Sequence, residues 1–258
     1  MKQKLTACVV FIAAVLFTSV IAISFYTPTV PSVSTGGHAL PDVNVPDNTV
    51  APDDVNPSTS GGAVPAVDAS RVISFNQFPD YPTGCESAAL YILLRYYGVD
   101  VTMDDIVSAL PKEPNPYIDG GVLYGGDPDR GFIGDPTDPF SYGVLNHPIA
   151  EAANKFLEGA EALVGLDAED IESYCEGSAV IAWISMSPEI EPKITVWTDH
   201  KTGKDVTWVS GEHAVVVYAS VDGGYMISDP RTGTKHFLSS EDFSIGFERY
   251  GGRIVYYP

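Results

Sequence analysis

The spacing of apolar residues divides the second part of the chain into predicted helices followed by predicted strands. From residue 71 onward, apolar positions three or four residues apart predict helices at 85–97, 102–110, 148–157, 167–175 and 241–248. Alternating or short apolar runs predict strands at 179–186, 195–198, 205–209, 213–221, 225–228, 235–238 and 253–257. Because most helices precede the strands, we predict an α+β domain over residues 71–258, with N-terminal helices packed on a mostly antiparallel sheet.

The first segment is apolar and uncharged. Residues 5–25 contain no Asp, Glu, Lys or Arg, and at about 1.5 Å per residue a helix of this length crosses the hydrocarbon core of a bilayer. Lys2 and Lys4 are expected to stay on the cytoplasmic side, which directs the rest of the chain outward. Residues 1–26 are therefore interpreted as a transmembrane anchor, with a cleaved signal peptide as the alternative.

Residues 27–70 have a different composition. They hold seven prolines, five aspartates and repeated Ser, Thr and Gly, but almost no large apolar residue. Such a segment has too little apolar surface to form a core, and its prolines keep it extended. We interpret it as a disordered tether that would hold the domain at 71–258 away from the membrane.

The chain is strongly acidic. Lys and Arg number 14 against 34 Asp and Glu, which gives a net charge of -20 at pH 7. Such a surface repels phosphate groups, so nucleic acid is not an expected partner. Three cysteines are too few for a disulfide-stapled fold, although a bridge between Cys85 and Cys175 would be compatible with an exported domain.

Cys85 is the first candidate catalytic residue. Pro82 and Gly84 favour a turn before it, and the predicted helix begins at or just after the cysteine. A thiol at a helix N-terminus faces unpaired N–H groups and the positive end of the helix dipole, which predicts a lowered pKa for the thiol. The same N–H groups could hold an oxyanion, together with the amide of Gln77. The structural alternative is a buried cysteine that packs in the core.

His213 is the candidate base because it opens the buried strand at 213–221. The other histidines fall in less suitable places: the tether, a helix start, a turn and a short exposed strand (His38, His147, His200 and His236). Asp229 ends the next strand, after the tight turn at 222–224. If the two strands pair as a hairpin, Asp229 lies near His213 and can orient its imidazole, as a catalytic triad requires.

Several short motifs in residues 73–258 together resemble one enzyme family. They are Gln77 upstream of Pro82-Thr83-Gly84-Cys85-Glu86-Ser87-Ala88-Ala89-Leu90, then Leu123-Tyr124-Gly125-Gly126, Gly134-Asp135-Pro136, Ser141-Tyr142-Gly143, Glu212-His213-Ala214-Val215 and Ser228-Asp229-Pro230. In this combination they resemble the C39-like, bacteriocin-processing type of cysteine peptidase. The resemblance is to the stand-alone bacterial members of that family rather than to the domains fused to transporters.

The resemblance implies a papain-like fold and a thiol peptidase. Cys85 would be the nucleophile, His213 the base, Asp229 the residue that orients His213, and Gln77 the side chain of the oxyanion hole. Gln77 lies further upstream of Cys85 than in the papain pattern. A peptide or protein is then the expected substrate. With an uncleaved anchor, the expected location is a bacterial cell surface, with the domain outside the cytoplasmic membrane.

Alternatives to this hypothesis remain open. The acidic segment 113–143 is predicted to be a long loop; it lacks the spacing of a calcium-binding loop, so we expect no metal and no cofactor, and interpret it as a wall of the cleft. A Cys–His amidase or acyltransferase of the cell wall would have the same residue order, but the Asp-Cys-Ser start typical of NlpC/P60 enzymes is missing. A non-catalytic module could keep the same fold and bind a peptide or the cell wall.

Overall fold

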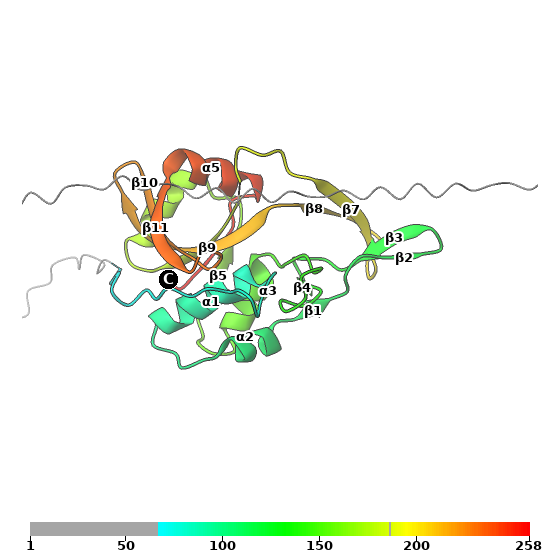
Figure 1. The fold of residues 1–258 in the computed structure, drawn as a ribbon, viewed down its shortest axis with the longest axis horizontal. Helices are drawn as coiled ribbons and strands as arrows, with labels where there is room; N and C mark the ends of the chain where they lie inside the picture. Colours follow the sequence, from blue (N-terminus) through cyan, green and yellow to red (C-terminus); the bar gives the residue numbers. More distant parts are fainter. Residues whose placement is uncertain (1–66, 186) are drawn as a thin grey trace, which may run out of the picture. The chain divides into compact units, whose positions relative to one another are not determined.

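A six-stranded antiparallel sheet lies at the centre of the fold, in a computed structural model that describes residues 67–185 and 187–258 (Figure 1). Its strand order is β11-β10-β9-β6-β12-β5, and each neighbouring pair is antiparallel. The strands are β5 (Glu161–Leu163), β6 (Val180–Ser185), β9 (Glu212–Val221), β10 (Gly224–Asp229), β11 (Thr234–Ser239) and β12 (Ile254–Tyr256).

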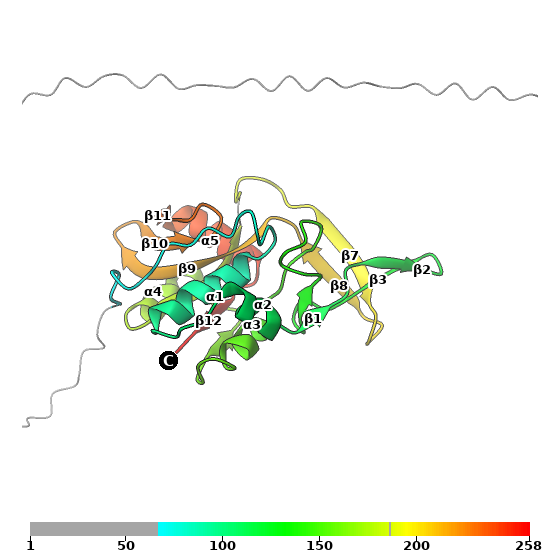
Figure 2. The same cartoon turned by 60° about the horizontal axis from the view of Figure 1, so that its bottom comes forward.

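Helices cover both faces of this sheet, as Figures 1 and 2 show. One face carries α1 (Cys85–Tyr96) and α3 (Asn146–Ala153), with α2 (Met103–Ala109) packed on α1. The other face carries the 3-10 turn η1 (Ala168–Asp170), α4 (Ile171–Cys175) and α5 (Ser240–Arg249). The expected packing of helices on a mostly antiparallel sheet is therefore observed.

Alternation along the central strands gives each face its own apolar core. Trp183 of β6 and Val216 of β9 belong to the core beneath α1, whereas their neighbours Ala182 and Val215 belong to the core beneath α5. Successive strand residues point to opposite faces, so a strand buried on both sides reads as the continuous apolar runs seen in the sequence.

Helix ends follow local signals that are visible in the sequence. Thr102 caps α2 with a reciprocal pair of hydrogen bonds to Asp105, and the two residues form a capping box. Gly98 follows α1 with a φ of +79°, a backbone conformation that favours glycine. Two expected helices differ in detail. The helix predicted at 148–157 spans Asn146–Ala153, and the helix predicted at 167–175 is divided into η1 and α4.

A second, four-stranded sheet contains part of the segment that was expected to be a long loop. Its order is β2-β3-β7-β8, formed by β2 (Tyr117–Asp119), β3 (Val122–Gly125), β7 (Ile194–Asp199) and β8 (Asp205–Val209). The loop prediction for 113–143 is wrong here, because Gly120 and Gly121 turn a hairpin and β3 then pairs in parallel with the distant β7. In the same region β1 (Lys112–Glu113) pairs in parallel with β4 (Phe132–Ile133).

No helix within residues 67–185 and 187–258 is both long and apolar enough to cross a membrane. The anchor expected at residues 1–26, and the tether expected at 27–70 up to residue 66, lie outside the described residues. The domain expected at 71–258 contains every helix and strand of the structure.

Candidate active site

Cys85 is the first residue of α1 and is 7% exposed. A tight turn leads into the helix, in which the Gly84 N–H donates to the Tyr81 carbonyl at 3.0 Å. A Cβ at Gly84 would lie 3.0 Å from Tyr81 Cβ and 3.1 Å from Pro136 Cβ, closer than nearly all real contacts of this kind. Glycine at this position therefore allows the turn to pack against Pro136, and Cys85 sits at the helix N-terminus that the sequence predicted.

His213 and Asp229 form a buried hydrogen-bonded pair at the end of the β9–β10 hairpin. His213 Nε2 lies 2.6 Å from Asp229 Oδ1. Asp229 Oδ1 also accepts the Arg231 N–H at 2.8 Å, and Oδ2 accepts the Thr232 hydroxyl at 3.2 Å. Burial opposes ionisation of Asp229, but His213 and these donors lower its pKa to about 2. An ionised Asp229 thus orients His213 through Nε2 and leaves Nδ1 for a second partner.

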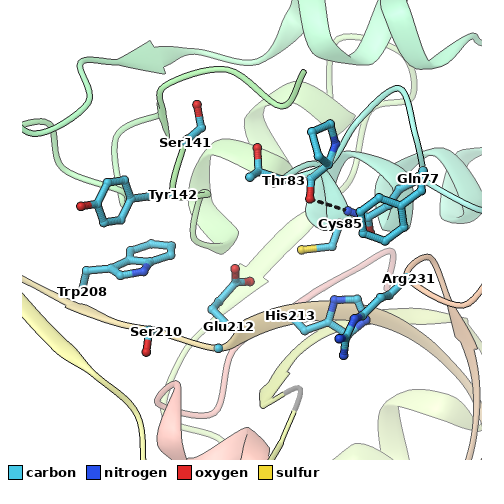
Figure 3. A pocket seen from close by; sticks show the side chains of 13 residues that line it. Gln77, Thr83, Cys85, Ser141, Tyr142, Trp208, Ser210, Glu212, His213 and Arg231 are labelled. Atoms are coloured by element: carbon cyan, nitrogen blue, oxygen red, sulfur yellow. Dashed lines mark hydrogen bonds between the residues drawn. The ribbon is translucent and has the colours of Figure 1, made fainter. Parts of the chain in front are cut away.

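Three of the four residues predicted for the site line one pocket of about 210 Å³: Gln77, Cys85 and His213. Figure 3 shows their side chains around this pocket, with Trp208 and Glu212 on the side away from Arg231. The fourth residue, Asp229, supports His213 and borders a neighbouring pocket. The fold thus brings together side chains that are far apart in the sequence.

The Cys85 thiol points toward two carboxyl groups. Its Sγ donates to Glu86 Oε2 at 3.3 Å, and Figure 3 shows the sulfur on the Glu212 side of the pocket. Burial raises the pKa of Cys85 well above its usual value, and the charges of Glu86 and Glu212 raise it further, while the Ala214 N–H opposes them. The prediction of a lowered thiol pKa is therefore wrong for this conformation, because burial and the carboxyl groups outweigh the helix dipole.

No hydrogen bond joins Cys85 to His213 in the part of the chain that the structure describes. The Gln77 side-chain amide is also hydrogen-bonded to other groups of the protein: its Nε2 donates to the Tyr81 carbonyl at 3.0 Å and to the Pro82 carbonyl at 3.4 Å. Gln77 Oε1 is buried without a partner. The predicted residues therefore share one pocket, in an arrangement in which the thiol and the Gln77 amide are bonded to other groups.

Glu86 and Glu212 are the site residues that the sequence reasoning missed. Each directly neighbours a candidate catalytic residue, and each is buried, at 0% and 8% exposure. Glu86 Oε1 accepts the Val144 N–H at 2.7 Å. A glutamate in the second position of a helix predicted to be buried is an unusual residue choice, and this was the signal available in the sequence. Trp208 also lines the pocket.

Two groups of side chains in the described residues could offer ligands to a metal ion. One is Cys85, Glu86 and Glu212, whose ligand atoms lie within 4.8 Å of one another. The other combines Glu113, Asp199 and His200, where cationic side chains already occupy the carboxylates. Arg130 and Lys201 bind Glu113 at 3.1 and 2.6 Å, and Arg130 binds Asp199 at 2.7 Å. The second group therefore works as an ion-pair network that ties β1 to the β7–β8 turn.

Cys175 lies on the other face of the central sheet from Cys85. It belongs to the core beneath α5, whereas Cys85 belongs to the core beneath α1. Both cysteines are free thiols. The alternative of a Cys85–Cys175 disulfide is therefore wrong, because the sheet separates the two residues.

Comparison with known proteins identifies the family of the chain. Residues 70–254 match the sequence model of the Peptidase_C39 like family. The chain is 25% identical over 189 residues to the uncharacterized protein YvpB of Bacillus subtilis (strain 168), which covers 71% of this chain and 73% of YvpB. The fold is similar to the crystal structure of a provisionally assigned C39-like peptidase from Bacillus anthracis, with a TM-score of 0.65 and 25% identity over 74% of this chain and 96% of that one. The chain belongs to the Peptidase_C39 like family.

Proposed function

We propose that the protein is a cysteine peptidase of papain-like fold that uses Cys85, His213 and Asp229. The observation that carries this proposal is the 2.6 Å bond between His213 and Asp229, beside a pocket that His213 shares with Cys85. Membership of the C39-like family supports a peptidase-type function. A histidine held by a buried carboxylate next to a cysteine at a helix N-terminus is an arrangement suited to acyl transfer.

In the proposed reaction, the Cys85 thiol transfers its proton to His213 Nδ1 and the thiolate attacks the carbonyl carbon of a peptide bond. His213 then gives this proton to the leaving amine as the C–N bond breaks, which leaves a thioester on Cys85. A water molecule transfers a proton to His213 and attacks the thioester, and the departing thiolate recovers the proton. The products are an amine and a carboxylic acid.

The reaction requires the thiol to leave Glu86. Because Cys85 Sγ donates to Glu86 Oε2 at 3.3 Å, we infer that the structure represents a resting arrangement. Rotation about the Cα–Cβ bond of Cys85 would bring the sulfur toward the imidazole that shares its pocket. Since the charges of Glu86 and Glu212 raise the thiol pKa, the proton transfer becomes easier as the sulfur moves away from them.

The oxyanion of the tetrahedral intermediate would be held at the start of α1. The Cys85 N–H is at the first helical position and needs no partner within the helix. Gln77 would supply the second donor after releasing its bonds to Tyr81 and Pro82, the longer of which measures 3.4 Å. We therefore keep Gln77 as a proposed oxyanion-hole residue that becomes available when substrate binds.

We further propose that residues 1–26 anchor the protein in the cytoplasmic membrane of a bacterium and that 27–70 tether the domain outside it. The uncharged apolar run at 5–25, preceded by Lys2 and Lys4, supports this orientation. A tethered peptidase acts on peptides or proteins near the membrane surface or at the cell wall. Peptides and proteins are thus the proposed substrates.

One observation favours the alternative of a non-catalytic peptide-binding module. In the structure the Cys85 thiol donates a hydrogen bond to Glu86 and none to His213. A cysteine without a catalytic role could be held in this way. A module of this kind would bind a peptide in the same pocket and leave it intact. The alternative and the peptidase proposal therefore differ in a single measurable property, the hydrolysis of the bound peptide.

The proposed function is tested by incubating the purified full-length protein with a mixed peptide library under reducing conditions and identifying products by mass spectrometry. We expect new N-termini with the wild type and none with Cys85→Ala or His213→Ala. Circular dichroism and thermal unfolding of each variant show that the fold is kept. A wild type that binds library peptides but cuts none would favour the non-catalytic module.

A further inference from the structure

The proposed reaction leaves two buried acids beside the nucleophile without a role. Glu86 is 0% exposed and Glu212 is 8% exposed, and an oxygen of one carboxyl group lies within 4.8 Å of an oxygen of the other. Burial raises the pKa of Glu86 to about 7 and that of Glu212 well above its usual value. Burying two carboxyl groups together is costly unless a positive charge or a shared proton compensates them.

The protein's own cations do not supply this charge. None of the salt bridges within residues 67–185 and 187–258 involves Glu86 or Glu212. Arg249 and Arg253 border a second pocket with Glu212, but they bond to other groups. Arg249 donates to Ser185 Oγ at 2.9 Å, and Arg253 donates to Asp129 Oδ1 at 3.1 Å.

One oxygen of this pair is buried without a hydrogen-bond partner. Glu212 Oε1 is buried and accepts no hydrogen bond, although Glu212 lines the pocket that contains Cys85. Gln77 Oε1 is a second buried acceptor without a partner on a residue that lines the same pocket. Buried oxygens of this kind are rare in native proteins, and a donor group of a bound substrate would satisfy them.

Aromatic rings complete this end of the pocket. Trp208 and Tyr142 both line it and pack edge to face, with ring centroids 5.7 Å apart. A Cβ on Gly143 would lie 3.0 Å from Trp208 Cη2 and 3.2 Å from Glu212 Oε2, so the indole and the carboxyl group lie against the same stretch of backbone. Guanidinium and ammonium groups bind well where an aromatic ring and a carboxylate meet.

We propose that Glu212, supported by Glu86 and flanked by Trp208 and Tyr142, forms a subsite for a positively charged group of the substrate. The group is the side chain of Arg or Lys, or the free amino terminus of a peptide, bound next to the scissile bond. Arg231 lines the opposite side of the pocket, as Figure 3 shows, so the charged end of the substrate lies toward Trp208. This inference rests on the proposed peptidase function and names its substrate class.

A cation in this subsite would also assist the nucleophile. The charges of Glu86 and Glu212 raise the pKa of the Cys85 thiol, and a positive group bound to Glu212 offsets that effect. Substrate with the correct charge would then make the thiol easier to deprotonate. The preference for a positively charged substrate over an uncharged one would then appear in the rate of reaction as well as in binding.

The test compares the wild type with Glu212→Gln on peptides that differ in one residue near the scissile bond. Arg is paired with citrulline, which has the same shape without the charge, and Lys with norleucine. Glutamine keeps the size of Glu212 and removes its negative charge. Glu158→Gln, an exposed carboxyl group, is the matched control for net charge.

For wild type and Glu158→Gln, we expect kcat/KM to favour Arg over citrulline by about tenfold or more at one position. Glu212→Gln should bring this ratio close to one while it still cleaves the citrulline peptide. Peptides with free and acetylated N-termini distinguish the amino terminus from a side chain as the bound group. A wild type that cleaves peptides without charge preference, or a preference that survives Glu212→Gln, would overturn the subsite and leave the peptidase proposal standing.

Binding to Cys85→Ala separates the two proposals. Isothermal titration calorimetry of this variant measures the affinity for the Arg and citrulline peptides without turnover. Tighter binding of the Arg peptide that disappears in Cys85→Ala/Glu212→Gln supports the subsite even if the wild type hydrolyses nothing. Equal affinity for both peptides would overturn it.

Discussion

Asp229 reaches His213 because the β9–β10 hairpin contains a one-residue register shift. The paired residues change between the turn and the site, from Met226 with Ala219 to Ile227 with Val217. Strand β9 therefore contains one more residue than the segment of β10 with which it pairs. Residues directly opposite each other on two paired strands point to the same face of the sheet. The shift turns Asp229 to the face of Val215 and His213, where its carboxylate lies 2.6 Å from Nε2.

Without this bulge, the register of the turn would place Asp229 opposite Val216, with its carboxylate on the other face of the sheet from His213. The register with the bulge and the register without it are both compatible with the apolar pattern, because β9 is buried on both faces. The sequence therefore predicted a hairpin that brings the two residues near each other, but it contained no sign of the bulge that makes them meet.

We predict that Asp229 sets the rate of peptide cleavage by orienting His213. Asp229→Ala should lower kcat/KM by about 100-fold or more, because the imidazole loses the hydrogen bond from Nε2 to the Asp229 carboxylate. Asp229→Asn should lower it less, since the amide oxygen can accept the same hydrogen bond. Steady-state kinetics on one peptide measure both variants, and equal losses for Ala and Asn would contradict the orienting role.

The carboxyl pair should control the reactivity of Cys85. Because Glu86 raises the pKa of the thiol, Glu86→Gln should lower it, and each unit of decrease gives about tenfold more thiolate at neutral pH. The glutamine oxygen can still accept the Val144 N–H. The measurement is the rate of iodoacetamide alkylation at Cys85 from pH 6 to about 10. A profile that is unchanged from wild type and Glu158→Gln would refute this electrostatic coupling.

Arg130 should be important for stability. Its guanidinium binds Glu113 and Asp199, whose side chains are only 4% and 1% exposed, so Arg130→Met would leave two buried carboxylates without their main partner. We expect the free energy of unfolding in urea to fall by about 3 kcal/mol. The matched control is Arg95→Met, which removes an exposed pair with Asp100 and should cost less than about 1 kcal/mol.

The effect of Arg130→Met should depend on pH. Hydrogen bonds from Arg130, Lys201 and His200 outweigh burial and lower the pKa of Glu113 to about 2, and Arg130 lowers the pKa of Asp199 as well. Stabilisation by a carboxylate with a lowered pKa is present above its ordinary pKa and is lost as the pH falls toward the lowered value. The difference between wild type and Arg130→Met should therefore shrink between about pH 5 and pH 2. A constant difference over this range would contradict the ion-pair explanation.

The proposed anchor is tested by cell fractionation. The full-length protein expressed in bacteria should appear in the membrane fraction, and its domain should be degraded by protease added to intact spheroplasts. A variant that lacks residues 1–26 should stay in the cytoplasm and be protected. Full-length protein in the cytoplasmic fraction would contradict both the anchor and the alternative signal peptide.

Much of the fold could be predicted because its signals are local. The apolar run after Cys85, the Thr102–Asp105 cap and the buried strand after His213 each determine an element through neighbouring residues alone. The pairing of β3 with β7 could not be predicted in this way, because it joins segments far apart in the sequence. The result was a long loop in the prediction where the structure has a hairpin and part of a second sheet.

The difference between local and long-range effects also explains which features of the site could be predicted. The helix dipole at Cys85 is a local effect, and it predicted a lowered thiol pKa. The opposing effects are burial in the core beneath α1 and the charge of Glu212, which β9 supplies from a distant part of the chain. The order Cys, His and Asp and the family motifs identified candidate residues. The state of their side chains depends on tertiary contacts that the sequence pattern does not reveal.

The most direct measurement of the central claim is the intact mass of the protein after rapid mixing with a peptide ester and acid quench. We predict that wild type gains the mass of the acyl group, that fragmentation maps it to Cys85, and that a second incubation with water releases it. Cys85→Ala should gain no mass, and His213→Ala should gain it far more slowly. A wild type that remains unmodified while the peptide bound in its pocket stays intact would contradict the account.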